Sequence, residues 1–446
     1  MRIETFITDA LGDASHVVID GASAAVVDPQ RDVRPYIEAA KRTGATIDFI
    51  FETHVHNDYL SGGRELAALG ARVVAPAAAN LAFPHLGLND GDEIQVGGAT
   101  LRALASPGHT YEHTAYLAGS GGGPEAAFTG GSLLMGSAGR SDLLGPDHTD
   151  SLTRAQWNSI RKIASVLEPG AMIYPTHGAG SFCSSSASIT DRFGALKTEQ
   201  GRNPALALAS YELFREAHLQ PAPTPAYYRY MAPINREGPK VFGTPPSVAH
   251  LDPGTATAHI EAGATAVDIR PIRDFASGHL RNSLSIEHGP SFLAYVGWFV
   301  PFNAPLVLVA GSVEHARLAT LDLFRIGYER VEGVVLASDI PAAQIDRFEP
   351  ASVDEAEAAL ASRERPVIDV RFAHEQEASP LPGAIAAPID RFAESNEAFP
   401  NDAIVICEAG YRATIAASFL RKRGLGAVPV LGTGITELQR RATVPA

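Results

Sequence analysis

Short apolar runs alternate with polar and helix-like stretches over the first half of the chain. Runs bounded by glycine, aspartate or asparagine are typical of β-strands, whereas apolar residues repeated every three or four positions are typical of helices. The alternation predicts mixed sheets with helices packed on their outer faces. The predicted helices are 34–43 and 152–168, and the predicted strands are 17–19, 24–28, 47–51, 72–75, 93–96, 100–105 and 171–174.

The second half of the chain contains an internal repeat. Residues 266–270 (Ala-Val-Asp-Ile-Arg) match residues 367–371 (Val-Ile-Asp-Val-Arg), and the later apolar run 306–310 matches 403–407. The first copy has extra residues around 292–299, which account for its longer spacing. Each copy alternates strands and helices, so each is predicted to form a small parallel α/β domain.

Two stretches rich in turn-forming residues mark the predicted domain boundaries. Residues 232–246 contain Gly-Pro and Pro-Pro and are predicted to form a linker, and residues 339–350 separate the two repeat copies. The predicted architecture is therefore an α/β multi-domain chain. Its predicted domains are residues 1–235, 247–345 and 351–446.

Composition and charge narrow the classes of function. Apolar residues make up 45% of the 446 residues and charged residues 19%, so folded cores are expected. The formal net charge of -14 argues against nucleic acid or an anionic membrane as the main partner, because both need a basic surface. No secretory signal is visible, and no apolar run approaches the roughly 20 residues that span a bilayer. We therefore expect a cytoplasmic protein that acts on small molecules.

Histidines follow three of the apolar runs. His54 and His56 are two residues apart, so their side chains point the same way in an extended segment, and Asp58 continues the row. His109 and His177 follow later apolar runs in the same manner. Neutral imidazole with carboxylate is a common ligand set for zinc and iron, so the pattern predicts a metal site. Three other histidines are expected to be hydrogen-bonding or surface residues: His16, His113 and His148.

The chain has two cysteines, which excludes a stabilising disulfide framework. Cys407 lies between an apolar run and a segment of helical composition, where backbone N–H groups and a helix N-terminus are expected to hold a negatively charged sulfur. Gly410 permits the tight loop, and Arg412 adds a positive charge. Ala310 stands at the matching position of the first repeat copy, which therefore has no thiol there. For Cys183, packing and a redox role both stay open.

Four motifs in the first predicted domain carry a family resemblance. They are Thr-His-x-His-x-Asp (53–58), Ser-Pro-Gly-His-Thr (106–110), Phe-Thr-Gly (128–130) and Thr-His-Gly (176–178). Together they resemble the metallo-β-lactamase fold in its glyoxalase II and persulfide dioxygenase branch, which implies an αββα sandwich. The resemblance implies that His54, His56 and His109 hold a first metal ion. Asp58 and His177 correspond to a second site.

Two positions depart from the family pattern. Tyr59 stands where the family motif has a histidine, and Gly131 stands where an aspartate usually follows Phe-Thr-Gly. The second site then lacks a histidine and the bridging carboxylate, so we expect one divalent metal ion. Persulfide dioxygenases, as the resemblance implies, use a mononuclear iron, so Fe(II) is expected in preference to Zn(II). Whether Asp58 or Asp142 replaces the missing carboxylate is left open.

The last predicted domain carries a second resemblance. Its motifs are Asp-Val-Arg (369–371), Pro-Gly-Ala-Ile (382–385) and, after an apolar strand, Cys-x-x-Gly-x-Arg (407–412). These resemble the rhodanese (sulfurtransferase) family. The resemblance implies that Cys407 carries a persulfide, that the backbone of 408–412 cradles an anion, and that Arg412 helps to bind the anionic donor. Glu408 replaces a residue that is often basic, which weakens the binding of thiosulfate and leaves the natural donor open.

The order of the three predicted domains resembles that of persulfide dioxygenase–rhodanese fusion proteins. The preferred hypothesis is that a thiol persulfide is oxidised to sulfite at the metal, while Cys407 transfers sulfane sulfur between sulfite or thiosulfate and a thiol. A second hypothesis is a zinc-dependent thioester hydrolase of the glyoxalase II type. A third is a sulfurtransferase whose metal domain is catalytically degenerate. The expected partners are small thiol persulfides, sulfite and thiosulfate, and a homo-oligomer is left open.

Overall fold

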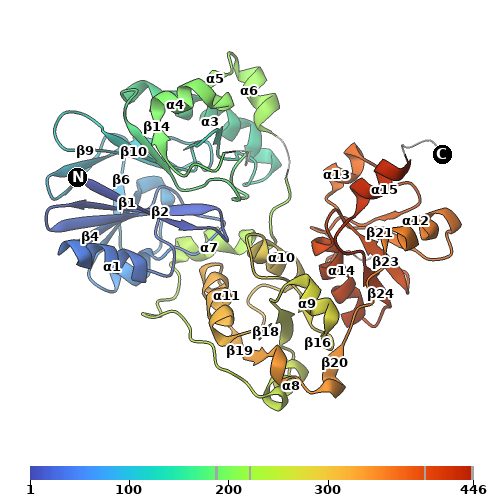
Figure 1. The fold of residues 1–446 in the computed structure, drawn as a ribbon. Coiled ribbons are helices and arrows are strands. Elements are labelled where there is room, and N and C mark those ends of the chain that lie inside the picture. The colour runs from blue at the N-terminus through green and yellow to red at the C-terminus, as the bar shows by residue number, and fades with distance from the viewer. Residues whose placement is uncertain (186–188, 220–221, 396–397, 443–446) are drawn as a thin grey trace. The chain divides into compact units, whose positions relative to one another are not determined.

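The computed structural model describes residues 1–185, 189–219, 222–395 and 398–442. The chain divides into two compact units, Met1–Pro245 with Phe324–Gly327, and Pro246–Leu323 with Tyr328–Ala446. Both units combine helices with sheets, which confirms the predicted α/β multi-domain fold (Figure 1). Among the described helices, none is long and apolar enough to cross a membrane.

Two six-stranded sheets form the framework of the first unit. The strands of the first sheet are β1 (Arg2–Thr8), β2 (Asp13–Asp20), β3 (Ser23–Val27), β4 (Thr46–Phe51), β5 (Arg72–Pro76) and β6 (Leu86–Leu88), in that order. The second sheet has the order β14 (Gly194–Ala195), β13 (Met172–Pro175), β10 (Ala126–Gly130), β9 (Thr114–Gly119), β8 (Ala99–Ala105) and β7 (Glu93–Val96). A short hairpin joins β11 (Leu133–Leu134) to β12 (Ser137–Ala138).

The main apolar core of this unit lies between the two sheets. Phe51 and Val74 from the first sheet pack with Tyr116 and Phe128 from the second. Burying a side chain of this size stabilises a fold by about 1.5–3 kcal/mol, so this layer holds the sheets together. It also fixes the strand ends that lie along one edge, from which the histidine motifs extend.

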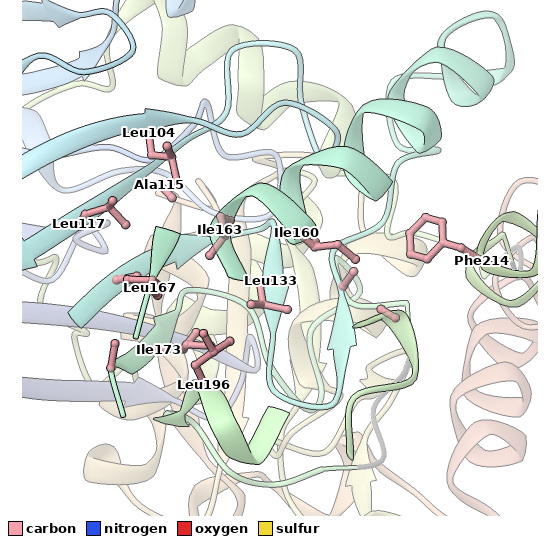
Figure 2. Close-up of a cluster of buried hydrophobic side chains, with 14 of the residues drawn as sticks. Leu104, Ala115, Leu117, Leu133, Ile160, Ile163, Leu167, Ile173, Leu196 and Phe214 are labelled. Atoms are coloured by element: carbon pink, nitrogen blue, oxygen red, sulfur yellow. The ribbon is translucent and has the colours of Figure 1, made fainter. Parts of the chain in front are cut away.

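Helices cover the outer faces of both sheets, which gives the predicted αββα order (Figure 1). Tyr36 and Ala40 of α1 (Arg34–Thr43) and Leu66 of α2 (Gly63–Ala67) pack on the first sheet. Ile160 and Ile163 of α3 (Pro146–Val166) pack on the second sheet, as Figure 2 shows. The remaining helices of this unit are α4 (Leu196–Arg202), α5 (Pro204–Ala207), α6 (Tyr211–His218), α7 (Tyr228–Glu237) and the 3-10 turn Ala77–Ala79.

Two predicted boundaries in this unit differ from the structure. Helix α3 begins at Pro146 rather than at residue 152, because proline is well tolerated in the first turn of a helix. The prediction of a linker over 232–246 is wrong for its first residues, since α7 continues to Glu237. The burial of Tyr228 and Met231 stabilises α7 in spite of its internal proline.

The second unit contains two four-stranded parallel sheets with the same topology. The first has the order β17 (Leu284–Ser285), β15 (Thr265–Asp268), β18 (Leu306–Ala310) and β19 (Val331–Leu336). The second has the order β22 (Ile385–Ala386), β21 (Val367–Asp369), β23 (Ala403–Ile406) and β24 (Ala427–Pro429). A small antiparallel pair joins β16 (His279–Leu280) to β20 (Ile345–Asp346).

The helices of the second unit follow the repeat as well. Those in the first copy are α8 (Pro253–Glu261), α9 (Ile272–Ser277), α10 (Phe292–Phe299) and α11 (Val313–Arg325), with 3-10 turns at Ala337–Asp339 and Ala342–Gln344. Those in the second copy are α12 (Val353–Ser362), α13 (Ala373–Ala378), α14 (Tyr411–Lys422) and α15 (Ile435–Ala442). Each copy therefore builds a parallel sheet flanked by helices, as predicted from the sequence repeat.

Matching hydrogen bonds support the repeat at the level of single residues. Arg270 forms an ion pair with Asp268, and its guanidinium donates to the carbonyl of Gly278 at 2.8 Å. In the second copy Arg371 forms an ion pair with Asp369 and donates to the carbonyl of Ser379 at 2.7 Å. In both copies the arginine thus ties the end of one strand to the loop after the following helix.

Candidate metal centre and sulfur-transfer loop

Parallel strand pairing brings the site residues to one edge of the first unit. Val27 at the end of β3 pairs with Phe51 at the end of β4, so Asp28 and the segment after Phe51 lie side by side. In the other sheet Gly130 at the end of β10 pairs with Pro175 at the end of β13, which places Thr176 and His177 at the same edge.

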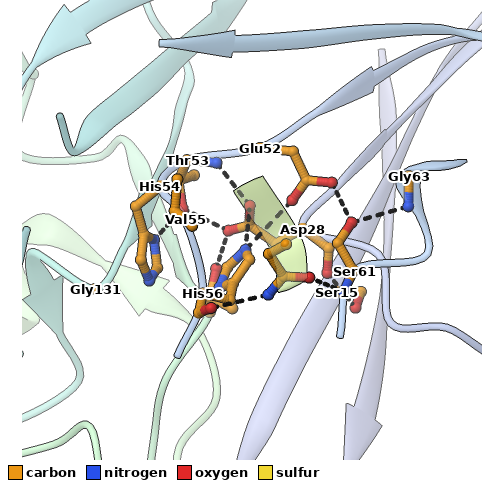
Figure 3. Close-up of polar contacts among 12 residues, drawn as sticks. Ser15, Asp28, Glu52, Thr53, His54, Val55, His56, Ser61, Gly63 and Gly131 are labelled. Carbon is orange, nitrogen blue, oxygen red and sulfur yellow. Dashed lines mark hydrogen bonds and ion pairs between the residues drawn. The ribbon is translucent and has the colours of Figure 1, made fainter. Parts of the chain in front are cut away.

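The buried carboxylate of Asp28 organises this edge (Figure 3). It accepts hydrogen bonds from the backbone N–H and the hydroxyl of Thr53, both at 2.7 Å, and from the hydroxyl of Thr176. Burial raises the pKa of Asp28, but the nearby His56 and these hydrogen bonds outweigh burial and lower the pKa to about 2. Asp28 is therefore a fixed anion that links both sheets.

His54 is held in one tautomer by the same network. The Thr53 hydroxyl gives its proton to Asp28, so it accepts a hydrogen bond from His54 Nδ1 at 2.9 Å. The lone pair of His54 is then on Nε2, which lies 3.3 Å from Nε2 of His177. Burial lowers the pKa of His54 well below its ordinary value, so the ring is neutral. A neutral imidazole with a buried Nε2 lone pair can bind a metal ion without first losing a proton.

His56 has a different environment, as Figure 3 shows. Its Nε2 lies 3.2 Å from Asp28 and 3.4 Å from Glu52, and the Tyr59 ring stacks on it with centroids 4.4 Å apart. Burial opposes a charge on His56, but the two carboxylates outweigh burial and raise its pKa well above the ordinary value. Its Nε2 is thus engaged by the ion pairs, and only Nδ1 is left for a metal ion.

His177 lies at the centre of the cluster. Its Nδ1 lies 2.9 Å from Asp13 and 3.2 Å from Asp58, which orients the ring and leaves Nε2 facing His54. Burial lowers the pKa of His177, but Asp58 and Asp13 outweigh burial and raise it to about 10. A carboxylate that holds Nδ1 of a metal-binding histidine is a common arrangement in metal centres. The structure therefore brings Asp58 and His177 together and adds Asp13 to them.

His109 completes the cluster. Its Nδ1 donates to the backbone carbonyl of Arg140 at 2.7 Å, so its lone pair is on Nε2. Burial lowers the pKa of His109 well below its ordinary value, and the ring centroids of His54 and His177 lie 4.8 and 5.2 Å away. Among the described residues, His109 Nε2 is buried and has no hydrogen-bond partner.

Gly131 leaves room for the His109 imidazole. A Cβ atom at residue 131 would lie 2.3 Å from Cδ2 and 2.8 Å from Nε2 of His109. The backbone N–H of Gly131 donates to Nε2 of His113 at 2.9 Å, and His113 Nδ1 bonds the Ser106 hydroxyl. His113 therefore holds the backbone in place, as expected for a histidine outside the metal site.

The side chains present fit a divalent metal ion. Two nitrogens each about 2.1 Å from a tetrahedral ion lie about 3.4 Å apart, close to the 3.3 Å between Nε2 of His54 and Nε2 of His177. Several buried ligand atoms lack hydrogen-bond partners within the described part of the chain, and a cation would satisfy them. These are His56 Nδ1, Asp58 Oδ1, Asp13 Oδ2 and His109 Nε2. His54, His56 and His109 remain the predicted ligands from the sequence, and the distances add His177.

Three features of this site were missed or left open from the sequence. Asp28 was assigned only to a strand end, although a buried acid that closes an apolar strand was a usable signal. Asp13 gave no local signal, because its role depends on pairing with His177 across the sheets. Asp142 forms a two-bond ion pair with Arg140, at 2.9 and 2.7 Å, and is occupied there.

The second site is the loop from β23 to α14. Cys407 follows β23, and Gly410 precedes the first turn of α14 with φ of 93°, a conformation that favours glycine. The backbone N–H of Gly410 donates to Sγ of Cys407 at 3.2 Å. Residues of the loop thus point a donor at the sulfur, and the helix N-terminus adds positive potential.

Arg412 does not stand free beside this loop. It forms a two-bond ion pair with Glu375 of α13, and its guanidinium lies over the Phe372 ring at 5.2 Å. Arg412 also interacts electrostatically with Cys407. An anionic donor would therefore compete with Glu375 for Arg412, and Glu408 adds a further negative charge next to the sulfur.

The first repeat copy contributes aromatic side chains near the same loop. The Tyr295 ring packs edge to face against Tyr411 with centroids 5.2 Å apart, and Trp298 packs against Phe372 at 5.8 Å. Both belong to α10, whose eight residues are all buried. The copy that has Ala310 at the nucleophile position thus helps to position the loop that carries Cys407.

Known proteins resemble both parts of the chain. Residues 352–441 match the Rhodanese-like domain family. A metallo-beta-lactamase from Staphylococcus aureus has a solved structure with a TM-score of 0.68 and 26% identity, covering 75% of this chain and 99% of that one. The chain joins a metallo-β-lactamase fold to a rhodanese-like domain. Its buried histidines, carboxylates and Cys183 have the composition of a divalent-metal site.

Curated relatives of the metallo-β-lactamase unit carry the name hydroxyacylglutathione hydrolase. One from Acidiphilium cryptum is 38% identical over 164 residues, 36% of this chain and 62% of the relative. Another, from Rhodopseudomonas palustris (strain BisB18), is 29% identical over 252 residues, 56% of this chain and 89% of the relative. The chain thus spans less than two thirds of the first relative and most of the second.

The space around Gly131 leads to a test of the role of His109. Gly131→Ala puts a Cβ where the imidazole lies, so we expect the affinity for Zn(II) or Co(II) to fall at least about tenfold, as when contacts that orient a ligand are lost. Gly170→Ala is the control, because a Cβ there meets nothing within 4 Å. Competition with a chromophoric chelator measures both variants. Equal affinity in Gly131→Ala and the parent chain would contradict the assignment of His109 as a ligand.

Proposed function

We propose that this chain oxidises a low-molecular-weight thiol persulfide to sulfite in its metallo-β-lactamase unit and transfers sulfane sulfur on Cys407. One observation carries the proposal: a buried histidine cluster suited to one metal ion and a cysteine held by a backbone donor occur in one chain. A persulfide is a substrate for both sites, since its outer sulfur can be oxidised or passed to a thiolate.

The transfer step needs no external oxidant or reductant. The Cys407 thiolate attacks the outer sulfur of a donor persulfide, the donor S–S bond breaks, and the donor thiolate leaves. Sulfite then attacks the outer sulfur of the Cys407 persulfide, so that thiosulfate leaves and the Cys407 thiolate returns. The Gly410 N–H, 3.2 Å from Sγ, holds the negative sulfur through both steps.

The oxidation step balances with one O₂. One thiol persulfide, one O₂ and one water give one thiol, one sulfite and two protons, with the outer sulfur oxidised and O₂ reduced. A bound Fe(II) ion would supply the redox chemistry, and three of the four clustered histidines, His54, His56, His109 and His177, would hold it. Asp13 and Asp58 fix the orientation of the His177 ring, and the burial of the cluster excludes bulk water.

A thioester hydrolase is the second candidate, favoured by the names of the curated relatives. That activity would need an ion that activates water. Tyr59, which stands where the family motif has a histidine, stacks on His56 and donates to the Asp28 carbonyl, so it supplies no second-site ligand. A hydrolase that uses two ions would therefore lack a ligand here, which favours the single-ion oxygenase.

Substitution of Cys407 tests the transfer half. We expect Cys407→Ser to abolish sulfur transfer from a thiol persulfide to sulfite, because serine cannot form the persulfide. Mass spectrometry of the intact chain after exposure to the donor should show one added sulfur in the parent and none in the variant. Ser312→Ala, in the corresponding loop of the first copy, is the control and should keep full activity. Retained transfer in Cys407→Ser would contradict the proposal.

The ion pair of Arg412 predicts a preference among donors. Glu375→Gln frees the guanidinium for an anion, so kcat/KM with thiosulfate should rise about fivefold, corresponding to ~1 kcal/mol for a partly exposed pair. Steady-state assays with thiosulfate and cyanide measure the change. Glu377→Gln, an exposed residue of the same helix, should leave the rate as it is. A lower rate in Glu375→Gln would mean that Glu375 assists donor binding instead.

Oxygen uptake tests the oxidation half. Fe(II)-loaded protein with glutathione persulfide should consume one O₂ per sulfite formed. His109→Ala should lower this rate by more than about tenfold, whereas His148→Ala, an exposed residue, should not. An oxygen electrode and a sulfite assay give the two quantities. Hydrolysis of a hydroxyacylglutathione without any O₂ uptake would instead establish the thioester hydrolase.

A further inference from the structure

Cys183 lies at the histidine cluster, but neither the proposed oxidation nor the proposed sulfur transfer uses it. Its side chain is fully buried, and its backbone carbonyl accepts a hydrogen bond from the N–H of Arg140 at 2.8 Å. The carbonyl of Arg140 in turn accepts the hydrogen bond from His109 Nδ1. One peptide segment therefore positions both Cys183 and His109.

The sulfur of Cys183 is within reach of the same ion as the histidines. Its Sγ and ring nitrogens of His109 and His177 all lie within 4.8 Å of one another. Among the described residues, the thiol donates long hydrogen bonds of 3.4 Å to Asn57 Oδ1 and 3.5 Å to Asp58 Oδ2. A small movement of Sγ would bring it to the distance at which thiolate binds zinc, about 2.3 Å.

A second observation at this place points to a ligand. His109 is 1% exposed, and its Nε2 lone pair has no hydrogen-bond partner among the residues that the structure describes. A buried acceptor without a partner is costly unless an ion or water satisfies it. The unpartnered nitrogen of His109 and the buried thiol of Cys183 thus both indicate that a ligand, such as a metal ion, binds at this place.

The net charge of the ligands gives a reason why a thiolate would bind the metal ion. Gly131 provides no carboxylate, and its Cβ position is filled by the His109 ring, so no side chain can be added there without displacing a ligand. Three neutral imidazoles alone would leave a divalent ion with its full charge. One thiolate would supply the single negative charge that a carboxylate at residue 131 would have carried.

We propose that Cys183 binds the metal ion as a thiolate, together with His109 and His177, which lie within reach of the same ion, and a third histidine of the cluster. This inference rests on the metal centre of the proposed function and names its fourth ligand. Coordination breaks the S–H bond, forms one sulfur–metal bond and releases the proton to water, with no change in oxidation state. Zinc, iron and cobalt all accept mixed imidazole and thiolate ligands.

With a fourth protein ligand, the identity of the metal decides whether the site keeps an open position for substrate. A tetrahedral zinc ion with four protein ligands has no open position and is a structural rather than a catalytic site. Non-haem Fe(II) oxygenase sites with three protein ligands keep several positions open, so a fourth still leaves room for substrate. The chain should therefore oxidise persulfide with Fe(II) bound and be inert with Zn(II) bound.

Cobalt spectroscopy tests the ligand without relying on activity. The chain has two cysteines, so Cys183 is the only thiol left in Cys407→Ser. Co(II) added to metal-free Cys407→Ser protein should produce the intense near-ultraviolet absorption of a thiolate–cobalt bond. Cys183→Ser, which keeps Cys407, should bind Co(II) without this band and at least about tenfold more weakly. Far-ultraviolet circular dichroism confirms that each variant is folded.

The outcomes separate this inference from the function it rests on. Co(II) that binds to Cys407→Ser with histidine-type absorption alone would overturn the role of Cys183 and leave the metal centre intact. Failure of the parent chain to bind Co(II), Zn(II) or Fe(II) would overturn both. A band in Cys407→Ser decides in favour of Cys183 even if Cys183→Ser does not fold, because no other thiol is present.

Discussion

The histidine cluster depends on the buried carboxylate of Asp28. It accepts hydrogen bonds from Thr53 and Thr176, so one anion ties the ends of β4 and β13 in opposite sheets. Through the Thr53 hydroxyl it sets the tautomer of His54, and it pairs directly with His56. Removing one partner of a buried charge pair typically lowers the free energy of unfolding by about 3–5 kcal/mol. Asp28 therefore stabilises the fold more than its position at a strand end suggests.

Most of the framework could be predicted from the sequence because local patterns determine it. The apolar runs became strands, the repeat became two sheets of the same topology, and the Cys407 loop lies between β23 and α14. Two helices differ from this rule because they depend on contacts with residues distant in the sequence. Helix α7 continues through residues with linker composition because Tyr228 and Met231 are buried. Helix α10 is apolar on all sides, but the sequence alone could not show that it packs against Tyr411 and Phe372.

The candidate site was predicted in its residue types and less well in their roles. His54, His56, His109 and His177 do gather in one cluster. Which ring nitrogen of each histidine is available to a metal ion depends on the carboxylate that the other nitrogen contacts. These carboxylates come from segments far apart in the sequence. Asp28 and Glu52 engage Nε2 of His56, while Asp13 and Asp58 hold Nδ1 of His177 so that its Nε2 faces His54. At the sulfur site, likewise, local patterns could not show that Arg412 pairs with Glu375 of a neighbouring helix.

The central claim is that one ion is held in the cluster of His54, His56, His109 and His177 although residue 131 carries no carboxylate. The proposed oxidation of a persulfide depends on that ion, because the side chains of the cluster alone could not activate O₂. Anomalous diffraction at the metal absorption edge, on crystals of protein purified without added metal, tests this directly. We expect one peak per chain, within bonding distance of Nε2 of His177 and of ring nitrogens of two more histidines of the cluster. Two peaks, one peak between Asp13 and Asp58, or none would contradict the account.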